Sequence, residues 1–171
     1  DSQDPIMGQD IIYDDNDSFI QKLSPTRYPY KYEIIAEREY LCPALTLDGA
    51  DYFSSEGYEC RNMRFELRPM YVVKMTQLDP NYVYGVRMFY IDKETFLMNH
   101  MSNYDQKGRL YRTFDVNWSF FPEMGAVTYA GGLYLLRDHI DLHSSVQQFY
   151  MLPAYYTRKD LSLQGVIRKA K

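Results

Sequence analysis

The sequence predicts a mainly β fold with a few short helices, built on a curved antiparallel sheet, and three observations lead to this prediction. Four segments of alternating pattern follow one another between Pro69 and Trp118: PMYVVKMTQL, YVYGVRMFYI, TFLMNHMSNY and RLYRTFDVNW. The short connections between them, at 79–81, 92–94 and 105–108, are rich in residues that favour turns. The chain also contains 18 Tyr, which suits strand surfaces. Such short connections join antiparallel neighbours, so we expect a meander of consecutive strands without a helix.

Both faces of the predicted meander are partly apolar, whereas a sheet with one face in water alternates apolar with polar residues. We therefore expect both faces to be covered, by helices, by a partner or by an apolar ligand. A Tyr-rich sheet that is simply buried would show the same pattern. If a ligand is bound, eight residues are candidates for the wall of its site, on either face of each strand: Tyr71, Val73, Met75, Val86, Met88, Tyr90, Phe114 and Trp118.

The remaining segments predict short helices at the two ends and further strands between them. A helix is expected from Asp17 or Ser18 to Leu23, and another after Asp160 or Ser162 with Leu163, Val166 and Ile167 on its buried side. Three more strands are expected at Lys31–Leu41, Glu59–Leu67 and Val127–Leu136. The pair Gly131–Gly132 inside the last of these predicts a bulge, a sharp bend or a close approach to the backbone.

The size and charge of the chain narrow the class of protein. Its 171 residues correspond to a single domain. The net charge of −4, without a basic stripe, argues against nucleic acid as a partner. No segment approaches the roughly 20 apolar residues of a membrane helix. The polar start DSQDPIMGQD is not a signal peptide, so we expect a mature form, a fragment, or a domain cut from a longer protein.

Cys42 and Cys60 stand at the two ends of a turn-rich loop. If the strands on either side of this loop are neighbours, both thiols lie near the base of one hairpin, where a disulfide can form. The even number of cysteines allows a bridge without requiring one, so two free thiols are an equal alternative.

Candidate metal and catalytic residues are few. Asp14–Asp17 resembles part of a calcium loop but lacks its glycine and its closing glutamate, so a solvated turn and helix cap is the better interpretation. His139, Asp141 and His143 would share one face of a strand and could bind zinc with a further ligand, although any half-exposed strand has this pattern. The position of His100 indicates no ligand role. No catalytic motif is present, and we expect no enzyme, no metal and no cofactor.

Several segments resemble a bacterial family of unknown function, whose members are often labelled outer-membrane lipoprotein-sorting proteins. They include FELRPMYVVKMTQLDPNYVYGVRMFYIDKETF, YDQKGRLYRTFDVNWSFFPEMG, LYLLRDHIDLHSS and RKDLSLQGVIRKAK. The resemblance covers nearly the whole chain and identifies residues 1–171 as the C-terminal part of a longer periplasmic protein. It implies the fold of the lipoprotein carrier LolA and its receptor LolB, an open half-barrel around an apolar cavity that helices cover. It implies no catalytic residue.

Three functions are compatible with these observations. The first is a periplasmic carrier or accessory protein that binds a lipid or another apolar molecule and takes part in lipoprotein or lipid trafficking. The second is an interaction module that docks an envelope transporter or an outer-membrane partner by its sheet edge. The third is a metal-dependent hydrolase built on His139, Asp141 and His143. We expect the first.

Overall fold

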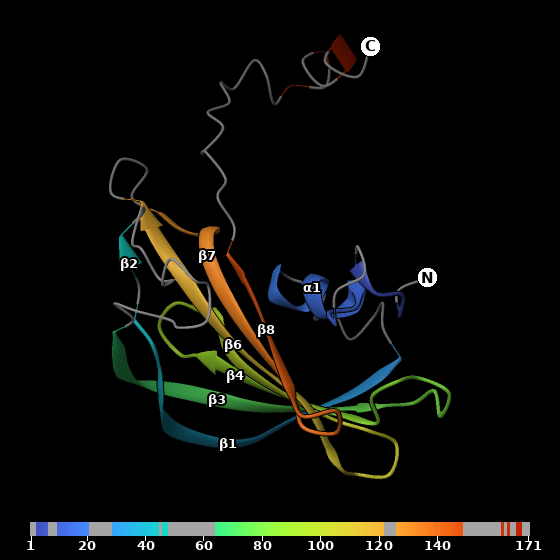
Figure 1. The fold of residues 1–171 in the computed structure, drawn as a ribbon. Coiled ribbons are helices and arrows are strands. Elements are labelled where there is room, and N and C mark those ends of the chain that lie inside the picture. Colours follow the sequence, from blue (N-terminus) through green and yellow to red (C-terminus); the bar gives the residue numbers. More distant parts are fainter. Residues whose placement is uncertain are drawn as a thin grey trace.

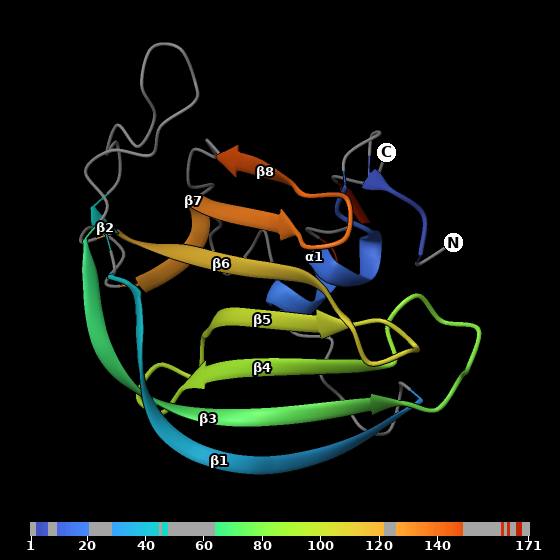
Figure 2. The same ribbon diagram turned by 60° about the horizontal axis from the view of Figure 1, so that its bottom comes forward.

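One antiparallel sheet forms most of the molecule (Figure 1). The structure is a computed structural model and describes residues 3–6, 10–20, 29–44, 46–47, 64–121, 126–148, 162, 164 and 167–168. Its elements are α1 (Tyr13–Ile20), β1 (Tyr30–Pro43), β2 (Thr46–Leu47), β3 (Phe65–Gln77), β4 (Val86–Asp92), β5 (Met98–Tyr104), β6 (Leu110–Phe121), β7 (Ala126–Asp138) and β8 (His143–Gln148). The strand order is β1-β3-β4-β5-β6-β7-β8, and the short β2 pairs with β6 in parallel (Figure 2). The end strands β1 and β8 do not pair, so the sheet is a curved half-barrel and not a closed barrel.

The predicted meander from Pro69 to Trp118 is confirmed as β3 to β6, in consecutive antiparallel pairs. Two strands begin later than the sequence pattern indicates. Before β4, residues 82–85 form a loop, in which a Cβ on Gly85 would lie 3.0 Å from the carbonyl oxygen of Asp105. Before β5, the carboxylate of Asp92 accepts the N–H groups of Glu94 and Thr95 and fixes a turn, in which Phe96 has a φ of 58°.

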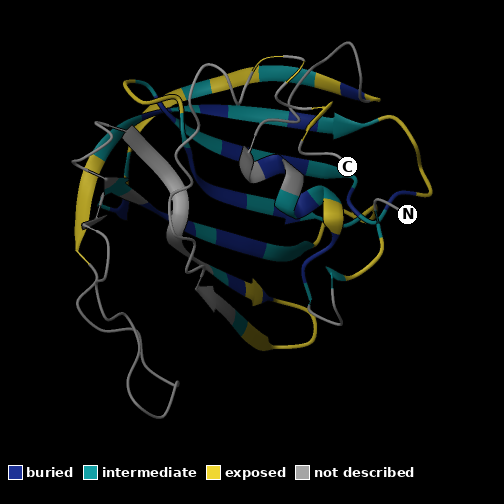
Figure 3. Ribbon diagram, turned by 90° about the horizontal axis from the view of Figure 1, so that it is seen from above, coloured by how far each residue is buried: buried dark blue, intermediate teal, exposed yellow. Residues whose placement is uncertain are grey.

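The helix α1 lies against the inner side of the curved sheet (Figure 3). The main core forms between them and joins Ile11, which precedes α1, to Phe89, Met101, Phe114 and Leu136 of the sheet. All four of these strand residues are fully buried. We refer to this side of the sheet as the helix face.

The β1–β3 pair forms a long ribbon, whose second half turns back toward β5 and β6. In this half, Met70, Val72 and Cys42 are buried. The ring of Tyr40 packs on Tyr90 at a centroid distance of 4.6 Å. The expectation that both sides of the sheet need a cover is therefore met by α1 on one face and by part of the ribbon on the other.

The predicted strand at Val127–Leu136 is confirmed as β7, and the glycine pair lies at an irregularity. Asn117 pairs with Leu133 whereas Ser119 pairs with Thr128, so four residues of β7, including Gly131 and Gly132, lie opposite Trp118 alone. The strand bends at this end (Figure 2).

The predicted helices differ from the structure. α1 begins at Tyr13 and not at Asp17 or Ser18, because Asp15 accepts the N–H of Ile12 and the acidic residues of the first turn favour the helix N-terminus. The predicted end near Leu23 lies outside the described residues. In the C-terminal segment, Gln164, Ile167 and Arg168 are helical, but Ile167 is 53 % exposed and not buried as expected. Leu163 and Val166 are not described.

The strand at Lys31–Leu41 is confirmed within β1. The segment Glu59–Leu67 was predicted as a strand separate from the meander. In the structure, Phe65–Leu67 belong to β3, which continues through Pro69, and residues 59–63 lie outside the described residues.

Cys42 is a free, buried thiol that donates to the carbonyl oxygen of Glu66, with a sulfur–oxygen distance of 3.8 Å. Cys60 is not among the described residues.

No helix among the described residues has the length and hydropathy needed to cross a lipid bilayer.

Candidate ligand-binding surface

The register divides the eight candidate wall residues between the two faces of the sheet. Val73 pairs with Phe89 of the main core, whereas Val72 pairs with Tyr90 and Lys74 with Met88. Val86, Met88 and Tyr90 therefore face away from α1. The other candidates, Tyr71, Val73, Met75, Phe114 and Trp118, belong to the helix face. No single cargo site can include all eight.

Three of the helix-face candidates are core residues. Met75, Phe114 and Trp118 are buried in the cluster that includes Ile11. The indole Nε1 of Trp118 also donates to the carbonyl oxygen of Met98, at 2.9 Å. Their side chains pack against protein, so a ligand would reach them only if α1 moved.

The candidates on the other face are half-buried. Tyr90 contacts the rings of Tyr40 and His100, which lie 4.6 and 5.2 Å from it between centroids. Burial, together with the nearby charge of Asp115, raises the pKa of Tyr40 to about 12. This hydroxyl is therefore neutral at physiological pH.

A buried ion pair connects α1 to the sheet. Nη2 of Arg87 lies 2.6 Å from Oδ1 of Asp15, and neither side chain is more than 2 % exposed. The hydroxyl of Tyr84 donates to Asp15 at 3.0 Å, and Nε of Arg87 donates to Asn103 at 3.2 Å. Burial raises the pKa of Asp15, against the charge of Arg87 and the hydrogen bonds from Ile12 and Tyr84, which act to lower it. The acidic segment at 14–17 is thus not simply a solvated turn, because Asp15 is buried and binds Arg87 of the sheet.

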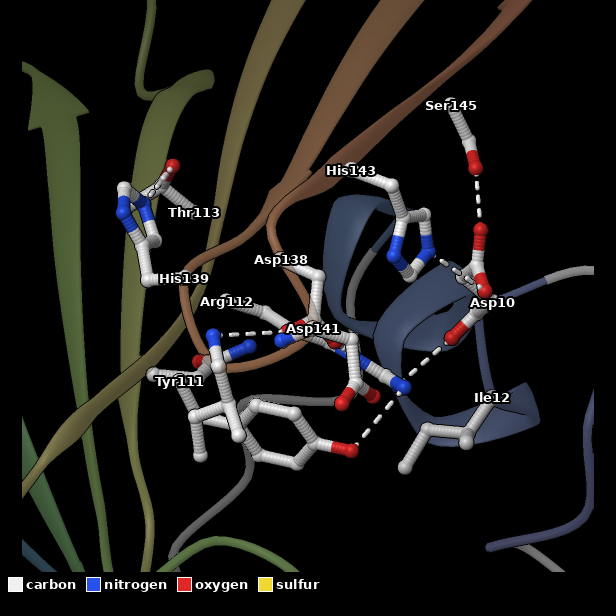
Figure 4. A network of polar contacts seen from close by, with 12 residues as sticks. Asp10, Ile12, Tyr111, Arg112, Thr113, Asp138, His139, Asp141, His143 and Ser145 are labelled. Carbon is white, nitrogen blue, oxygen red and sulfur yellow. Dashed lines mark hydrogen bonds and ion pairs between the residues drawn. The ribbon is translucent and has the colours of Figure 1, made fainter.

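Asp10, just before α1, makes a second group of polar contacts with the sheet (Figure 4). It accepts a hydrogen bond from Ser145, and its Oδ1 lies 3.0 Å from Nε2 of His143. Arg112 donates to the carbonyl oxygen of Asp10 at 2.5 Å and to Asp138 at 3.1 Å. Sequence reasoning missed this network, because its members are far apart in the chain and carry no motif.

The predicted arrangement of His139, Asp141 and His143 on one strand face is wrong. Asp138 accepts the N–H groups of Ile140 and Asp141, which turns the chain between β7 and β8. His139 then contacts the hydroxyl of Thr113 while His143 contacts Asp10, so the two imidazoles have separate partners (Figure 4). Within the described part of the chain, no group of three His, Cys, Asp or Glu could hold a metal ion.

The β1–β3 ribbon exposes large apolar side chains on the face that continues the helix face. Leu41 pairs with Leu67, and Phe65 lies two residues before Leu67 on the same strand. Leu41 is 60 % exposed, Leu67 57 % and Phe65 56 %. Ile34, opposite Val73, is 66 % exposed. We call Ile34, Leu41, Phe65 and Leu67 the ribbon surface. Of the candidate residues, the half-buried Tyr71 and Val73 lie between its two ends.

The family model for DUF1329, described as a protein of unknown function, matches residues 1–158. The chain belongs to the DUF1329 family. This confirms the family resemblance found in the sequence.

Two solved structures are similar to this DUF1329 chain. One is a DUF1329 family protein from Desulfovibrio piger, at 15 % identity and a TM-score of 0.53, covering 95 % of this chain and 55 % of that one. The other is a domain from Vibrio parahaemolyticus whose name proposes it as an outer membrane lipoprotein-sorting protein, at 15 % identity and a TM-score of 0.49, covering 98 % and 57 %. The DUF1329 chain therefore spans little more than half the length of either protein. Neither is named as an enzyme, and a search of curated proteins finds no match.

A small groove at the end of the ribbon does not provide an apolar wall. It lies between Pro43, Arg68, Asp92, Leu97 and Asn99. Nε of Arg68 lies 2.7 Å from Asp92, and its Nη2 lies 2.7 Å from Glu94. None of the eight candidates lines this groove.

Proposed function

We propose that this DUF1329 protein is a periplasmic carrier or accessory protein that binds a lipid or another long apolar molecule. The observation that carries the proposal is the ribbon surface, where four large apolar side chains are each more than half exposed. Large apolar side chains that gather on an exposed surface are typical of interaction sites on soluble domains. Leu41, Phe65 and Leu67 gather at one end of the ribbon, and Ile34 lies beyond the exposed Glu37 and Glu39 of the same face. The periplasm and a role in lipid or lipoprotein trafficking follow from the family resemblance and are part of the proposal.

The cargo would lie along the ribbon and extend over Tyr71 and Val73 toward the margin of the main core. Burying one of the exposed Leu or Phe side chains contributes about 1.5–3 kcal/mol. Tyr71 adds a ring whose face is already in contact with the ammonium of Lys93, 5.0 Å from the ring centroid. This contact fixes the ring where cargo would meet it.

Uptake of a fluorescent fatty acid tests the proposal. The change Leu67→Glu places a charge in the centre of the ribbon surface, and binding should weaken at least tenfold because an unpaired charge against an apolar cargo loses its solvation. Leu78→Glu is the matched control, since Leu78 follows the other end of β3 and is 65 % exposed. Both variants should melt like the parent protein, because both sites are in contact with water.

Two results would count against a carrier. One is absence of uptake by the parent protein, together with absence of a co-purifying apolar molecule in native mass spectrometry. The other is an equal effect of Leu67→Glu and Leu78→Glu.

A second candidate function is docking of an envelope partner on the edge strand β1. Within the described sheet β1 is an end strand, and its bulge leaves Ile34 and Ile35 exposed. An extended segment of a transporter or outer-membrane protein could add to such an edge. Capture of one defined partner from an envelope extract, lost in Ile35→Lys and kept in Leu67→Glu, would favour docking over cargo binding.

A further inference from the structure

His100 on β5 has hydrogen-bond partners at both ring nitrogens. Its Nδ1 lies 2.8 Å from Oδ1 of Asp115, and its Nε2 lies 2.9 Å from Oγ of Ser102. Asp115 is the residue opposite His100 on β6, and Ser102 is two residues further along β5. All three therefore share the face of the sheet that points away from α1, where side chains at alternate positions lie side by side.

The chemistry of Asp115 fixes the direction of the first hydrogen bond, since a carboxylate only accepts and Nδ1 must carry the proton. In the neutral imidazole, Nε2 then accepts the hydrogen of the Ser102 hydroxyl. Burial would raise the pKa of Asp115, but the hydrogen bond from His100 and the charge of Arg137 outweigh it and lower this pKa below 3.8. The carboxylate is thus ionised at neutral pH. Serine, imidazole and carboxylate in this order form the relay that activates a serine nucleophile.

The surroundings hold the imidazole. His100 is 8 % exposed and packs against Tyr40 and Tyr90, with centroid distances of 5.1 and 5.2 Å. Ser102 is half-buried, and its hydrogen bond with His100 is partly buried, so the pair is not enclosed in the core. The rings restrict rotation of the imidazole and keep Nε2 directed at the hydroxyl.

Two cations flank Ser102 in the same row of the sheet. The register places Lys74, Met88, Ser102, Thr113 and Arg137 on successive strands from β3 to β7. Strands lie about 4.8 Å apart, so the long side chains of Lys74 and Arg137 start about 10 Å from Ser102 on either side. Nη1 of Arg137 lies 2.7 Å from Oδ2 of Asp115, so its charge is paired with the carboxylate of the relay. Lys74 is the other cation of this row that could offset negative charge near the hydroxyl, because the backbone N–H groups of a central strand are engaged in the ladder.

We propose that Ser102 is a nucleophile activated by His100, and that it accepts an acyl group from an activated carboxylic ester. Oγ attacks the carbonyl carbon while its proton passes to Nε2 of His100. The bond to the leaving alcohol then breaks, and the alcohol oxygen takes that proton, which leaves an acyl-Ser102 ester. Water repeats the sequence and releases the carboxylic acid. Asp115 acts as a positioning residue. The proposal does not depend on cargo binding at the ribbon surface.

The experiment treats the full chain with a fluorophosphonate probe, which loses fluoride to a reactive serine, and with p-nitrophenyl acetate. The parent protein should take up one label, located at Ser102 by peptide mass spectrometry, and Ser102→Ala should take up none. Ser144→Ala is the matched control, since Ser144 faces the same side in the same row, is exposed and should be labelled no more than any surface serine. This variant should react like the parent.

The role of the imidazole has its own measurement. His100→Gln should slow labelling by about 100-fold, the lower range for loss of a general base. Asp115→Asn should slow labelling while leaving Ser102 the labelled site, and circular dichroism checks that each variant is folded. Label on another residue, equal labelling of Ser102→Ala, or a parent rate no faster than that of a serine in a short peptide overturns the proposal. Each of these results is available even if His100→Gln does not fold.

Discussion

The helix face and the ribbon surface have the same sequence pattern and opposite fates. In both, apolar side chains recur at alternate positions of a strand, as with Phe114, Val116 and Trp118 on β6 and with Phe65 and Leu67 on β3. Phe89, Met101 and Phe114 on the helix face are fully buried, whereas Leu41, Phe65 and Leu67 on the ribbon are more than half exposed. Alternation reports only that a face is apolar, and what covers the face decides whether it becomes core or surface.

The difference lies in the polar anchors of the cover. α1 has the sequence YDDNDSFI, which carries little apolar surface, yet it stays on the sheet because Asp15 reaches the buried Arg87. The ribbon is fixed by the pair of Arg68 with the buried Asp92 and by the exposed pair of Lys93 with Glu37. The Asp15–Arg87 pair holds a helix over the helix face, while the ribbon pairs hold the ribbon without covering its apolar side.

Removing the buried anchor should have the largest effect on this comparison. Asp15→Ala leaves the Arg87 guanidinium uncompensated in the interior, and the free energy of unfolding should fall by about 3–5 kcal/mol. Urea denaturation at pH 7 measures it. Glu37→Ala, which breaks an exposed pair at the ribbon, is the control and should change the midpoint little. Equal midpoints for the two variants would mean that α1 is not held by Asp15.

Truncation of one apolar side chain on each surface should separate core from surface directly. Phe89→Ala should cost about 3–5 kcal/mol, because it leaves a cavity beneath α1. Leu67→Ala should stay within about 0.5 kcal/mol, since its side chain is already in water. The change in unfolding free energy of each variant is obtained from its denaturation midpoint, with the same dependence on denaturant concentration used for both variants. A cost for Leu67→Ala approaching that of Phe89→Ala would show that the ribbon is covered in solution, and the carrier proposal would lose its main observation.

Acid should weaken the ribbon anchor in a defined pH window. Burial acts to raise the pKa of Asp92, but hydrogen bonds from Arg68 and from the N–H groups of Thr95 and Glu94 outweigh it and lower the pKa below 3.8. A pKa lower in the folded than in the unfolded state stabilises the fold above pH 3.8, and this contribution is lost as pH falls through the folded value. Asp92→Asn should therefore lose less stability than the parent between pH 5 and pH 3. An identical acid response of both proteins would assign the loss to other carboxyls.

The smallest effect concerns the thiol at the end of the ribbon. Burial raises the pKa of Cys42 to about 11, so iodoacetamide should not modify it in the folded protein at pH 8. After unfolding without reductant, Cys42 should be alkylated, which peptide mass spectrometry detects. A Cys42 that stays unmodified after unfolding would indicate a bridge to Cys60, the alternative that the sequence left open.

Much of the fold could be predicted from the sequence because its turns carry local chemistry. The Asp, Asn, Pro and Gly residues between the strands specify the meander, and the Gly131–Gly132 pair marks the irregularity of β7. At 139–142 the alternation of polar and apolar residues predicts a strand. The segment is a turn instead, because the carboxylate of Asp138 accepts hydrogen bonds from the backbone of Ile140 and Asp141. Single-residue periodicity does not reveal such an Asx-type turn, but an Asp preceding an exposed turn is a local signal for it.

The site was less predictable, since its contacts join distant segments. Nothing near Asp15 in sequence indicates Arg87, and His100 was set aside because both of its partners become neighbours only through strand pairing. The candidate wall mixed two faces, because the bounds of β3 and β4 alone do not give their register. Leu41, Phe65 and Leu67 lie in predicted strands outside the meander, and the sequence does not show that their side chains stay exposed, because exposure depends on which segments pack over the ribbon.

The anchors of the N-terminal segment also determine the order in which the chain can fold. The strands from β3 to β8 pair with neighbours in sequence, so each hairpin closes only a short loop. The contact of Asp15 with Arg87 spans 72 residues, and that of Asp10 with Arg112 spans 102. Long loops cost more entropy to close and close only after their distant partner is in place. The segment around α1 therefore precedes the sheet in the chain but docks only after it, and until the sheet exists its charged residues keep it in water.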